Sequence, residues 1–245
     1  MPEKTFHPRE MPRERRDTAS GAPPCKALEI CSRRVVLFPL GRAPRPVIWV
    51  HMPEKAATET AALLSGENLV LAAVTNADWD RELSPWPAPR AFHGGQDFSG
   101  SADKYLAELT DKIIPAAEAA LPEPPLWRGV AGYSLAGLFA AYAAWKTAVF
   151  SRFASVSGSL WFDGFLDFLK ADPPAHLPEA AYFSLGSLEK NAKNPRLATV
   201  EEQTRRAEAL LHALGVKTVF EQNEGGHFSE AASRMARGIR WLLYA

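Results

Sequence analysis

The segment VAGYSLAGLFAAY, residues 130–142, sets one serine, Ser134, among small residues. Strand-like apolar residues precede it, and large residues at helical spacing follow it. A side chain at the apex of an abrupt strand-to-helix turn projects beyond the sheet, and small neighbours such as Gly132, Ala136 and Gly137 let the strand and helix approach each other. Ser134 is therefore a candidate nucleophile in a strained turn.

A serine hydroxyl needs a base before it becomes a good nucleophile, and His227 is the best candidate. It lies in EQNEGGHFSEAA, between the last predicted strand and the last predicted helix, which is the usual place for such a base. His51 ends a predicted strand on the same side, where it either lines the pocket or simply terminates the strand. The remaining histidines are poorer candidates for the base, because they lie in the tail, in a glycine-rich loop or in or beside helices: His7, His93, His176 and His212.

An acid should orient the imidazole, and its usual place is after the strand between the serine and the histidine. Glu189, in AYFSLGSLEKNAKNP, is the best-placed carboxylate there. A serine–histidine pair without an acid is the alternative. Other carboxylates that could fill the role are Asp163, Asp167, Glu201, Glu202 and Glu224.

The same reasoning predicts groups around the reacting carbonyl. The backbone N–H of Leu135, in the first turn of the new helix, is expected to hold an oxyanion with help from the helix dipole. Met52 is the candidate for a second N–H because it follows the strand PVIWVH, although Pro53 beside it has no N–H. At least one of three tryptophans near the ends of predicted strands should line the pocket: Trp79, Trp86 and Trp161.

These residues must be positioned by an alternating series of strands and helices. Strand-like runs occupy residues 33–40, 46–51, 68–74, 127–132, 153–157, 181–186 and 218–223, and helical patterns occupy 56–64, 102–120, 135–150, 201–214 and 229–244. Such alternation predicts an α/β fold, a mostly parallel sheet with helices on both faces. No insertion is long enough for a large lid domain.

Composition limits the possible functions. The chain has 245 residues, 47% of them hydrophobic, and 28 basic residues balance 28 acidic ones, so neither nucleic-acid binding nor a disordered chain is favoured. Residues 1–24 mix prolines with charges of both signs and are expected to form a disordered tail ahead of one domain at 25–245. Cys25 and Cys31 are expected to be reduced packing residues. Without a membrane-spanning run or an apolar leader, the cytoplasm is the expected location.

The motifs resemble those of the esterase branch of the α/β-hydrolases that includes enterobactin-type siderophore esterases, esterase D and mycolyltransferases. The resemblance extends from about Ile30 to the C-terminus. It rests on GYSLAGLFA around Ser134, SVSGSLWF, YFSLGSLEKNAKNP and EGGHF around His227, in the family's order. NADWDRELSPWPAP resembles the tryptophan-rich loop of the smaller members. Ala136 stands where many hydrolases carry glycine.

The resemblance implies the α/β-hydrolase fold and cleavage of carboxylic esters, including siderophore-type esters, through an acyl-enzyme on Ser134. It implies no cofactor and no metal ion, and a small-molecule ester as the partner rather than nucleic acid or membrane. Alternatives are an acyltransferase or peptidase on the same fold, or a binding module without catalysis. Neither the particular ester nor the oligomeric state follows from the sequence.

Overall fold

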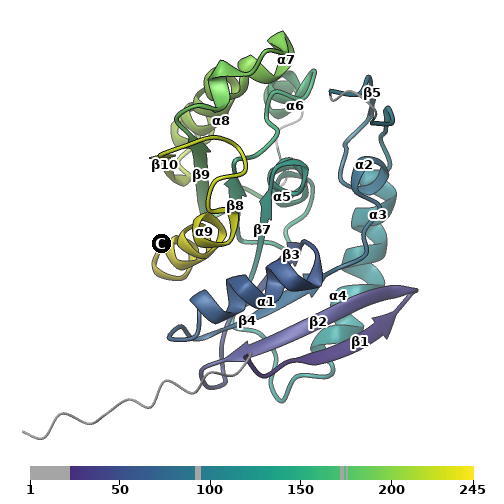
Figure 1. Ribbon diagram of the computed structural model, residues 1–245. Helices are drawn as coiled ribbons and strands as arrows, with labels where there is room; N and C mark the ends of the chain where they lie inside the picture. The colour runs from purple at the N-terminus through teal and green to yellow at the C-terminus, as the bar shows by residue number, and fades with distance from the viewer. Residues whose placement is uncertain (1–22, 92–94, 172–173, 175) are drawn as a thin grey trace, which may run out of the picture.

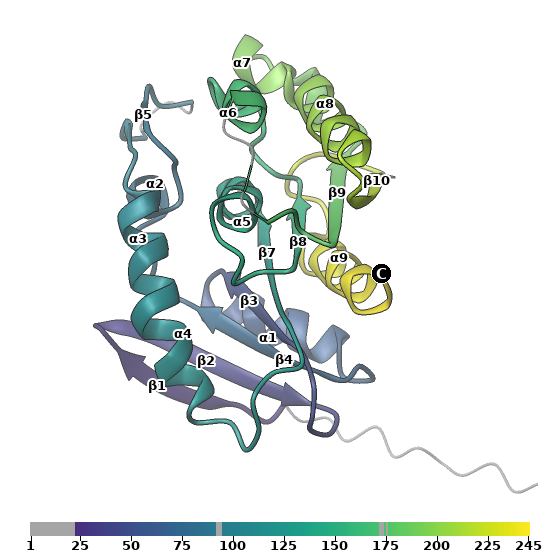
Figure 2. The ribbon, with the colours of Figure 1, turned by 180° about the vertical axis from the view of Figure 1, so that it is seen from behind.

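A mostly parallel sheet forms the centre of the molecule (Figures 1 and 2). The computed structural model describes residues 23–91, 95–171, 174 and 176–245. Within them the strand order is β1-β2-β4-β3-β7-β8-β9-β10, with β2 antiparallel to β1 and β4 and all later neighbours parallel. The strands are β1 (Lys26–Ile30), β2 (Arg33–Leu40), β3 (Val47–His51), β4 (Leu69–Val74), β7 (Arg128–Tyr133), β8 (Arg152–Val156), β9 (Ala180–Gly186) and β10 (Lys217–Asn223). The predicted α/β fold is confirmed.

Helices cover both faces of this sheet (Figure 2). One face carries α1 (Glu54–Leu63) and α9 (Ala231–Tyr244), which pack against each other. The other carries α3 (Ala102–Glu108), η1 (Leu109–Ile113), α4 (Ile114–Glu118), α5 (Leu135–Lys146) and α8 (Val200–Ala213). Shorter elements in the connections are α2 (Trp79–Glu82), β5 (Pro87–Ala88), β6 (Phe98–Ser99), α6 (Phe165–Ala171), η2 (Glu189–Asn191) and α7 (Pro195–Ala198).

Alternate residues of the strands enter two separate halves of the core, because successive side chains of a strand point to opposite faces. In β2, Val35 and Leu37 join the half under α5, whereas Val36 and Phe38 join the half under α1 and α9. The central strands are buried on both faces. Their apolar runs are therefore nearly continuous, as is typical of parallel sheets.

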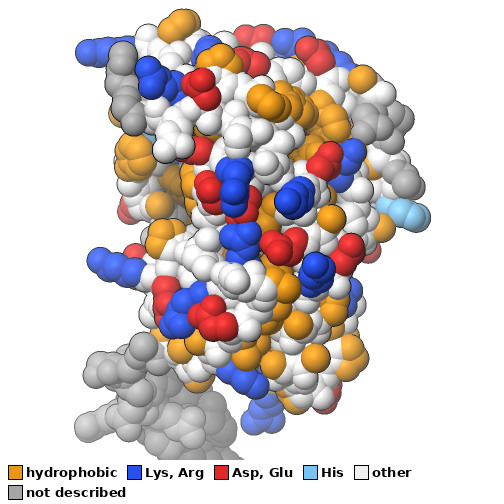
Figure 3. Space-filling model, turned by 90° about the vertical axis from the view of Figure 1, so that its right-hand side faces the viewer, with side chains coloured by type: hydrophobic (Ala, Val, Ile, Leu, Met, Phe, Trp, Pro, Cys, Tyr) orange, Lys and Arg blue, Asp and Glu red, His pale blue; other side chains and the backbone are white. Residues whose placement is uncertain are grey.

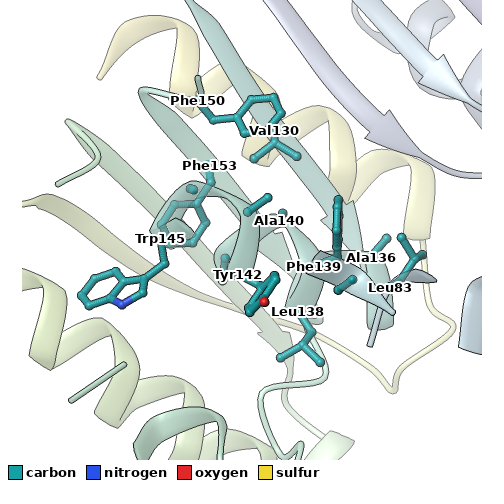
Figure 4. Close-up of a cluster of buried hydrophobic side chains, with 14 of the residues drawn as sticks. Leu83, Val130, Ala136, Leu138, Phe139, Ala140, Tyr142, Trp145, Phe150 and Phe153 are labelled. Atoms are coloured by element: carbon teal, nitrogen blue, oxygen red, sulfur yellow. The ribbon is translucent and has the colours of Figure 1, made fainter. Parts of the chain in front are cut away.

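Helix α5, which follows Ser134, is buried on almost every side. Every residue of it except Lys146 is buried, which accounts for its almost uninterrupted apolar sequence. Figure 4 shows Phe139 and Tyr142 of this helix in the cluster that also contains Val130 and Phe153 of the adjacent strands. The start of α5 is thus fixed against the centre of the sheet.

The N-terminal hairpin was not predicted, because the sequence indicated no strand before residue 33. Its turn residues Cys31 and Ser32 have φ values of 52° and 60°, the left-handed backbone that a two-residue type I′ turn requires. The usual Asn-Gly signal is absent there. The expectation that Cys25 and Cys31 pack in the interior is wrong: both are free and exposed, since Cys31 occupies the turn and Cys25 precedes an edge strand.

The helix expected over 102–120 contains one irregular turn. It starts at Ala102 and ends at Glu118, but η1 in its middle is a π-helix. Pro115 lies two residues after the end of η1 and has no N–H to donate to the carbonyl four residues earlier. The wider turn accommodates this missing bond.

Charges of both signs alternate on the face that carries α2, α3 and α4 (Figure 3). There Arg33 lies 2.6 Å from Glu82 and 3.3 Å from Glu108. In the described part of the chain, no helix has both the length and the apolar character needed to cross a membrane. The predicted tail falls almost entirely outside the described residues, so its disorder stays a prediction.

Candidate active site

Ser134 lies at the sharp turn between β7 and α5. Its backbone has φ 59° and ψ −123°, a conformation that residues other than glycine rarely adopt. The strand and helix meet so closely that a Cβ atom on Gly132 would lie 2.0 Å from the carbonyl oxygen of Ala136. The small residues around Ser134 are therefore a steric requirement of the turn.

The side chain of Ser134 faces the imidazole of His227. Nε2 of His227 lies 3.0 Å from Oγ of Ser134, and Nδ1 lies 2.7 Å from Oε2 of Glu189. Since an ionised carboxylate only accepts, Nδ1 carries the proton and Nε2 is free to accept one from the serine. This is the tautomer that a general base requires.

Glu189 is 8% exposed and binds His227 with one oxygen only. Its other oxygen, Oε1, accepts hydrogen bonds from the N–H of Gly186 at 2.6 Å and from Oγ of Ser157 at 2.8 Å. Burial by itself raises the pKa of this carboxyl, but the bonds from His227, Gly186 and Ser157 outweigh burial and hold the pKa below its usual value. Glu189 is thus an anion beside His227.

Backbone hydrogen bonds join the loops that carry the acid and the base. The N–H of Ser187 donates to the carbonyl of Asn223 at 2.7 Å, and that of Leu188 donates to the carbonyl of Gly225 at 3.1 Å. A Cβ atom on Gly186 would lie 2.4 Å from the Gly225 carbonyl oxygen. Side chains distant in sequence therefore meet at the carboxyl ends of parallel strands.

The other carboxylates that the sequence left open are engaged elsewhere or lie apart from His227. Asp163 pairs with Arg196 at 2.7 Å, and Glu201 lies 3.0 Å from both Lys190 and Arg205. Glu202 pairs with Arg206 at 3.2 Å. Asp167 lines a separate groove beside α6, and Glu224 contributes its backbone carbonyl to Arg234.

The two proposed oxyanion donors differ in availability. The N–H of Leu135, at the first position of α5, finds no acceptor among the described residues. The N–H of Met52 instead donates to the carbonyl of Val74 at 3.3 Å. The expectation for Met52 is therefore wrong, because its amide continues the parallel pairing of β3 with β4.

A cavity of about 200 Å³ adjoins Ser134 and His227. Among the three tryptophans, Trp161 lines it. Trp86 instead donates from Nε1 to the carbonyl of Asp163 at 2.9 Å, and Trp79 packs against the core at the start of α2. The sequence placed all three near strand ends but could not tell which side chain turns towards the serine.

His51 does not line this cavity, so the pocket role expected for it is wrong. Its side chain is fully buried, with Nε2 2.9 Å from the hydroxyl of Tyr105 and its ring against Phe139. Burial lowers the pKa of His51 to about 3, and the imidazole is therefore neutral. It terminates a strand and packs the core.

Sequence reasoning missed several groups at the site. Ser157 contacts Glu189, and Arg234 lies 3.5 Å from the same carboxylate. The motif SVSGS could have identified Ser157, whereas no signal distinguishes Arg234 from the other arginines of α9. Cavity-lining residues that were also missed are Ser159, Ala192, Leu197, Val200 and Phe228. The described residues hold no group of three or more His, Cys, Asp or Glu side chains arranged for a metal ion.

The sequence was compared with protein families and with known proteins. No family model matches the chain. Over 169 residues it is 27% identical to the uncharacterized protein YbbA of Bacillus subtilis (strain 168), covering 66% of this chain and 68% of YbbA. Because the identity is low, this relative establishes no family.

Several solved structures of similar fold are esterases or hydrolases by name. An IroE-like serine hydrolase from Shewanella oneidensis has a TM-score of 0.74 at 19% identity, covering 90% of this chain and 80% of its own. Siderophore hydrolase EstA from Aspergillus nidulans has a TM-score of 0.65 at 16% identity, covering 99% of both chains. The enterobactin esterase FES from Shigella flexneri has a TM-score of 0.65 at 19% identity, covering 89% of this chain and 59% of its own. The predicted α/β-hydrolase fold and its structural resemblance to siderophore esterases are confirmed.

Proposed function

We propose that this protein is a serine hydrolase that cleaves carboxylic esters through an acyl-enzyme intermediate. The observation that supports this proposal is the continuous hydrogen-bonded series from Ser134 through His227 to Glu189 beside a cavity. A serine hydroxyl, a correctly protonated imidazole and a buried carboxylate in this order perform acyl transfer on several unrelated folds.

In the proposed mechanism, His227 takes the proton of Ser134 at Nε2 while Oγ attacks the ester carbonyl carbon. The carbonyl π electrons move to oxygen, and the N–H of Leu135 with the positive end of α5 stabilises that oxyanion. When the tetrahedral intermediate collapses, His227 returns the proton to the departing alcohol. Glu189 remains ionised and stabilises the imidazolium throughout.

Water then replaces the alcohol. His227 removes a proton from water, the hydroxyl oxygen attacks the acyl carbon, and the carboxylic acid leaves as Ser134 regains its proton. Apart from water and the ester, each step uses side chains and backbone groups of this chain. Esters of the siderophore type are one candidate substrate class, because several of the structurally similar proteins are named for siderophores or enterobactin.

A fluorophosphonate probe and p-nitrophenyl acetate test this proposal together. The probe should label the wild-type protein and fail to label Ser134→Ala, and the ester should be hydrolysed without an added acceptor. Unlabelled wild-type protein without turnover would indicate a binding module. Turnover that depends on an added alcohol would indicate an acyltransferase, and turnover of peptides in preference to esters would indicate a peptidase.

A further inference from the structure

The cavity beside Ser134 is lined by both apolar and polar residues. Trp161, Ala192, Leu197, Val200 and Phe228 supply the apolar part, while the reacting groups and two serines supply the rest. Trp161 is 7% exposed and Val200 is 4% exposed, so both are held firmly by the surrounding structure. An apolar group that enters this cavity exchanges water for hydrocarbon contacts.

The walls offer no positive charge to a substrate. None of the lining residues is a lysine or an arginine, and Glu189 already binds His227, Gly186 and Ser157. An anionic group in the cavity would lie near the Glu189 carboxylate, and Arg234, which lies 3.5 Å from that carboxylate, is outside the cavity lining and so would not pair with it. Burying such an unpaired charge is strongly unfavourable.

The size of the cavity limits what can enter it. Its volume is about 200 Å³, and Phe228, one of the residues that line it, is 87% exposed. A cavity of roughly 150 Å³ is enough to bind benzene. One aromatic ring or a short alkyl chain therefore fills the space, and a larger ester can insert only one such group.

On the basis of the proposed function, we infer that the substrate is an ester with a small, uncharged apolar group on the side that enters this cavity. The geometry does not depend on whether that side is the acyl or the alcohol part. Whichever part enters the cavity, the group that enters is apolar and no larger than a single ring.

Two ester series test this inference with the full-length protein. One contains p-nitrophenyl acetate, butyrate, hexanoate, decanoate and hemisuccinate; the other contains the acetates of methanol, benzyl alcohol and naphthylmethanol. In one of the two series kcat/KM should fall tenfold or more above a size limit, because a pocket of this volume excludes larger groups. The expected limit is about six carbons in the acyl series or one ring in the alcohol series. If the acyl part enters the cavity, the hemisuccinate should also react at least tenfold more slowly than the butyrate.

Leu197→Ala should extend the size limit to longer chains or larger rings, whereas Leu188→Ala is the control, because Leu188 is 56% exposed and outside the cavity lining. A limit in the acyl series assigns the cavity to the acyl part, and a limit in the alcohol series assigns it to the alcohol. No limit in either series, or a limit that Leu197→Ala leaves unchanged, would overturn the inference. A wild-type protein that neither hydrolyses p-nitrophenyl acetate nor is labelled by the fluorophosphonate would instead overturn the proposed function.

Arg234 supports a second, independent inference, because it is a fully buried cation next to the acid. Its Nη1 lies 3.5 Å from Oε1 of Glu189 and donates to Oγ of Ser157 at 3.2 Å and to the hydroxyl of Tyr133 at 3.4 Å. Nη2 donates to the carbonyl of Glu224 at 2.6 Å. One guanidinium thus contacts segments next to the nucleophile, the acid and the base.

Ser157 completes this arrangement. It has a φ of 46°, unusual for a serine, and its hydroxyl donates to Glu189 while it accepts from Arg234. Oε1 of Glu189 is consequently held by several donors, and Oε2 is left to His227. Fixing the carboxylate in this way fixes the imidazole that it orients.

We propose that Arg234, acting through Ser157, is a positioning residue that keeps Glu189 ionised and aimed at His227. The titratable side chains near the guanidinium are Glu189 and Tyr133, with His227 one hydrogen bond further away. Removing the cation should favour protonation of Glu189, which could then no longer hold His227 in the tautomer that accepts the serine proton. The acidic limb of the kcat/KM profile should therefore move to higher pH in Arg234→Met.

The experiment compares Arg234→Met and Arg234→Lys with Arg237→Met, which removes an arginine of the same helix that pairs with Glu221 at 3.1 Å. Arg234→Met should lower kcat for p-nitrophenyl acetate tenfold or more with KM within about threefold, and Arg234→Lys should recover part of kcat. Ser157→Ala should lower kcat in the same direction and serves if Arg234→Met does not fold. Folded Arg234→Met, or failing that Ser157→Ala, with wild-type kcat and an unshifted pH profile would overturn the proposal.

Discussion

Nδ1 of His227 lies 2.7 Å from Oε2 of Glu189, although 38 residues separate them in the sequence. The contact depends on the loops after β9 and β10, which backbone hydrogen bonds hold together. A carboxylate at this place fixes the imidazole tautomer and stabilises the imidazolium that forms when the serine loses its proton. The contact therefore predicts that kcat falls when the negative charge of Glu189 is removed.

Glu189→Gln should fold normally and lose on the order of a hundredfold in kcat, because the amide cannot stabilise the imidazolium as a carboxylate does. The measurement is kcat for p-nitrophenyl acetate, with circular dichroism to verify folding. Glu201→Gln and Glu202→Gln are matched controls, since both carboxylates pair with exposed cations away from His227. A Glu189 variant within about threefold of wild type would favour a serine–histidine pair.

Gly132→Ala should disrupt the turn that presents Ser134. Its Cβ atom would lie 2.0 Å from the Ala136 carbonyl oxygen, so the strand and helix would have to separate. We expect the melting temperature to fall by several degrees and the activity to fall with it. Gly66→Ala is the control, because nothing lies within 4 Å of the added atom. Equal melting temperatures for both variants would contradict this account of the turn.

Sequence reasoning succeeded where local pattern and topology act together. Strand–helix alternation predicts a parallel sheet, and the carboxyl ends of its strands bring Ser134, Glu189 and His227 to one edge. The predicted strands 46–51 and 181–186 agree with β3 and β9 to within a residue or two at each end. Long apolar runs between turn signals are the strongest features of a sequence.

Sequence reasoning failed where the position of a side chain or the availability of an amide depends on three-dimensional packing. Whether the Met52 amide is free depends on how far β3 pairs with β4, which the sequence does not record. Arg234 and Arg237 both lie on α9, yet Arg234 is fully buried and Arg237 is only partly so. The direction in which Trp86 and Trp161 point is likewise decided by their neighbours.

Trp161→Ala should raise KM for an ester substrate more than it lowers stability, because this ring lines the cavity beside the serine. Trp86→Ala should show the opposite pattern. Its indole donates to the carbonyl of Asp163 and packs against Phe162 and Phe168, outside the cavity lining. Michaelis constants and melting temperatures of both variants test this difference. Unchanged kinetics in Trp161→Ala would contradict the cavity assignment.

The pH dependence of stability should also report on Glu189. Because its pKa in the folded protein lies below the usual value, the unfolded chain takes up this proton more readily as the pH falls. The stability that its ionised form contributes is therefore fully present above the pKa of an unfolded glutamate and is lost as the pH falls through the lowered value.

Glu189→Gln has no proton to gain at this position, so it should lack this part of the pH dependence. Urea unfolding of both proteins at about pH 7 and about pH 3.5 measures the effect, provided that each stays folded at the lower pH. The free energy of unfolding should fall more steeply with acidification in the wild type than in the variant. Parallel falls in the two proteins would show that the hydrogen bonds to Glu189 do not favour its ionised form.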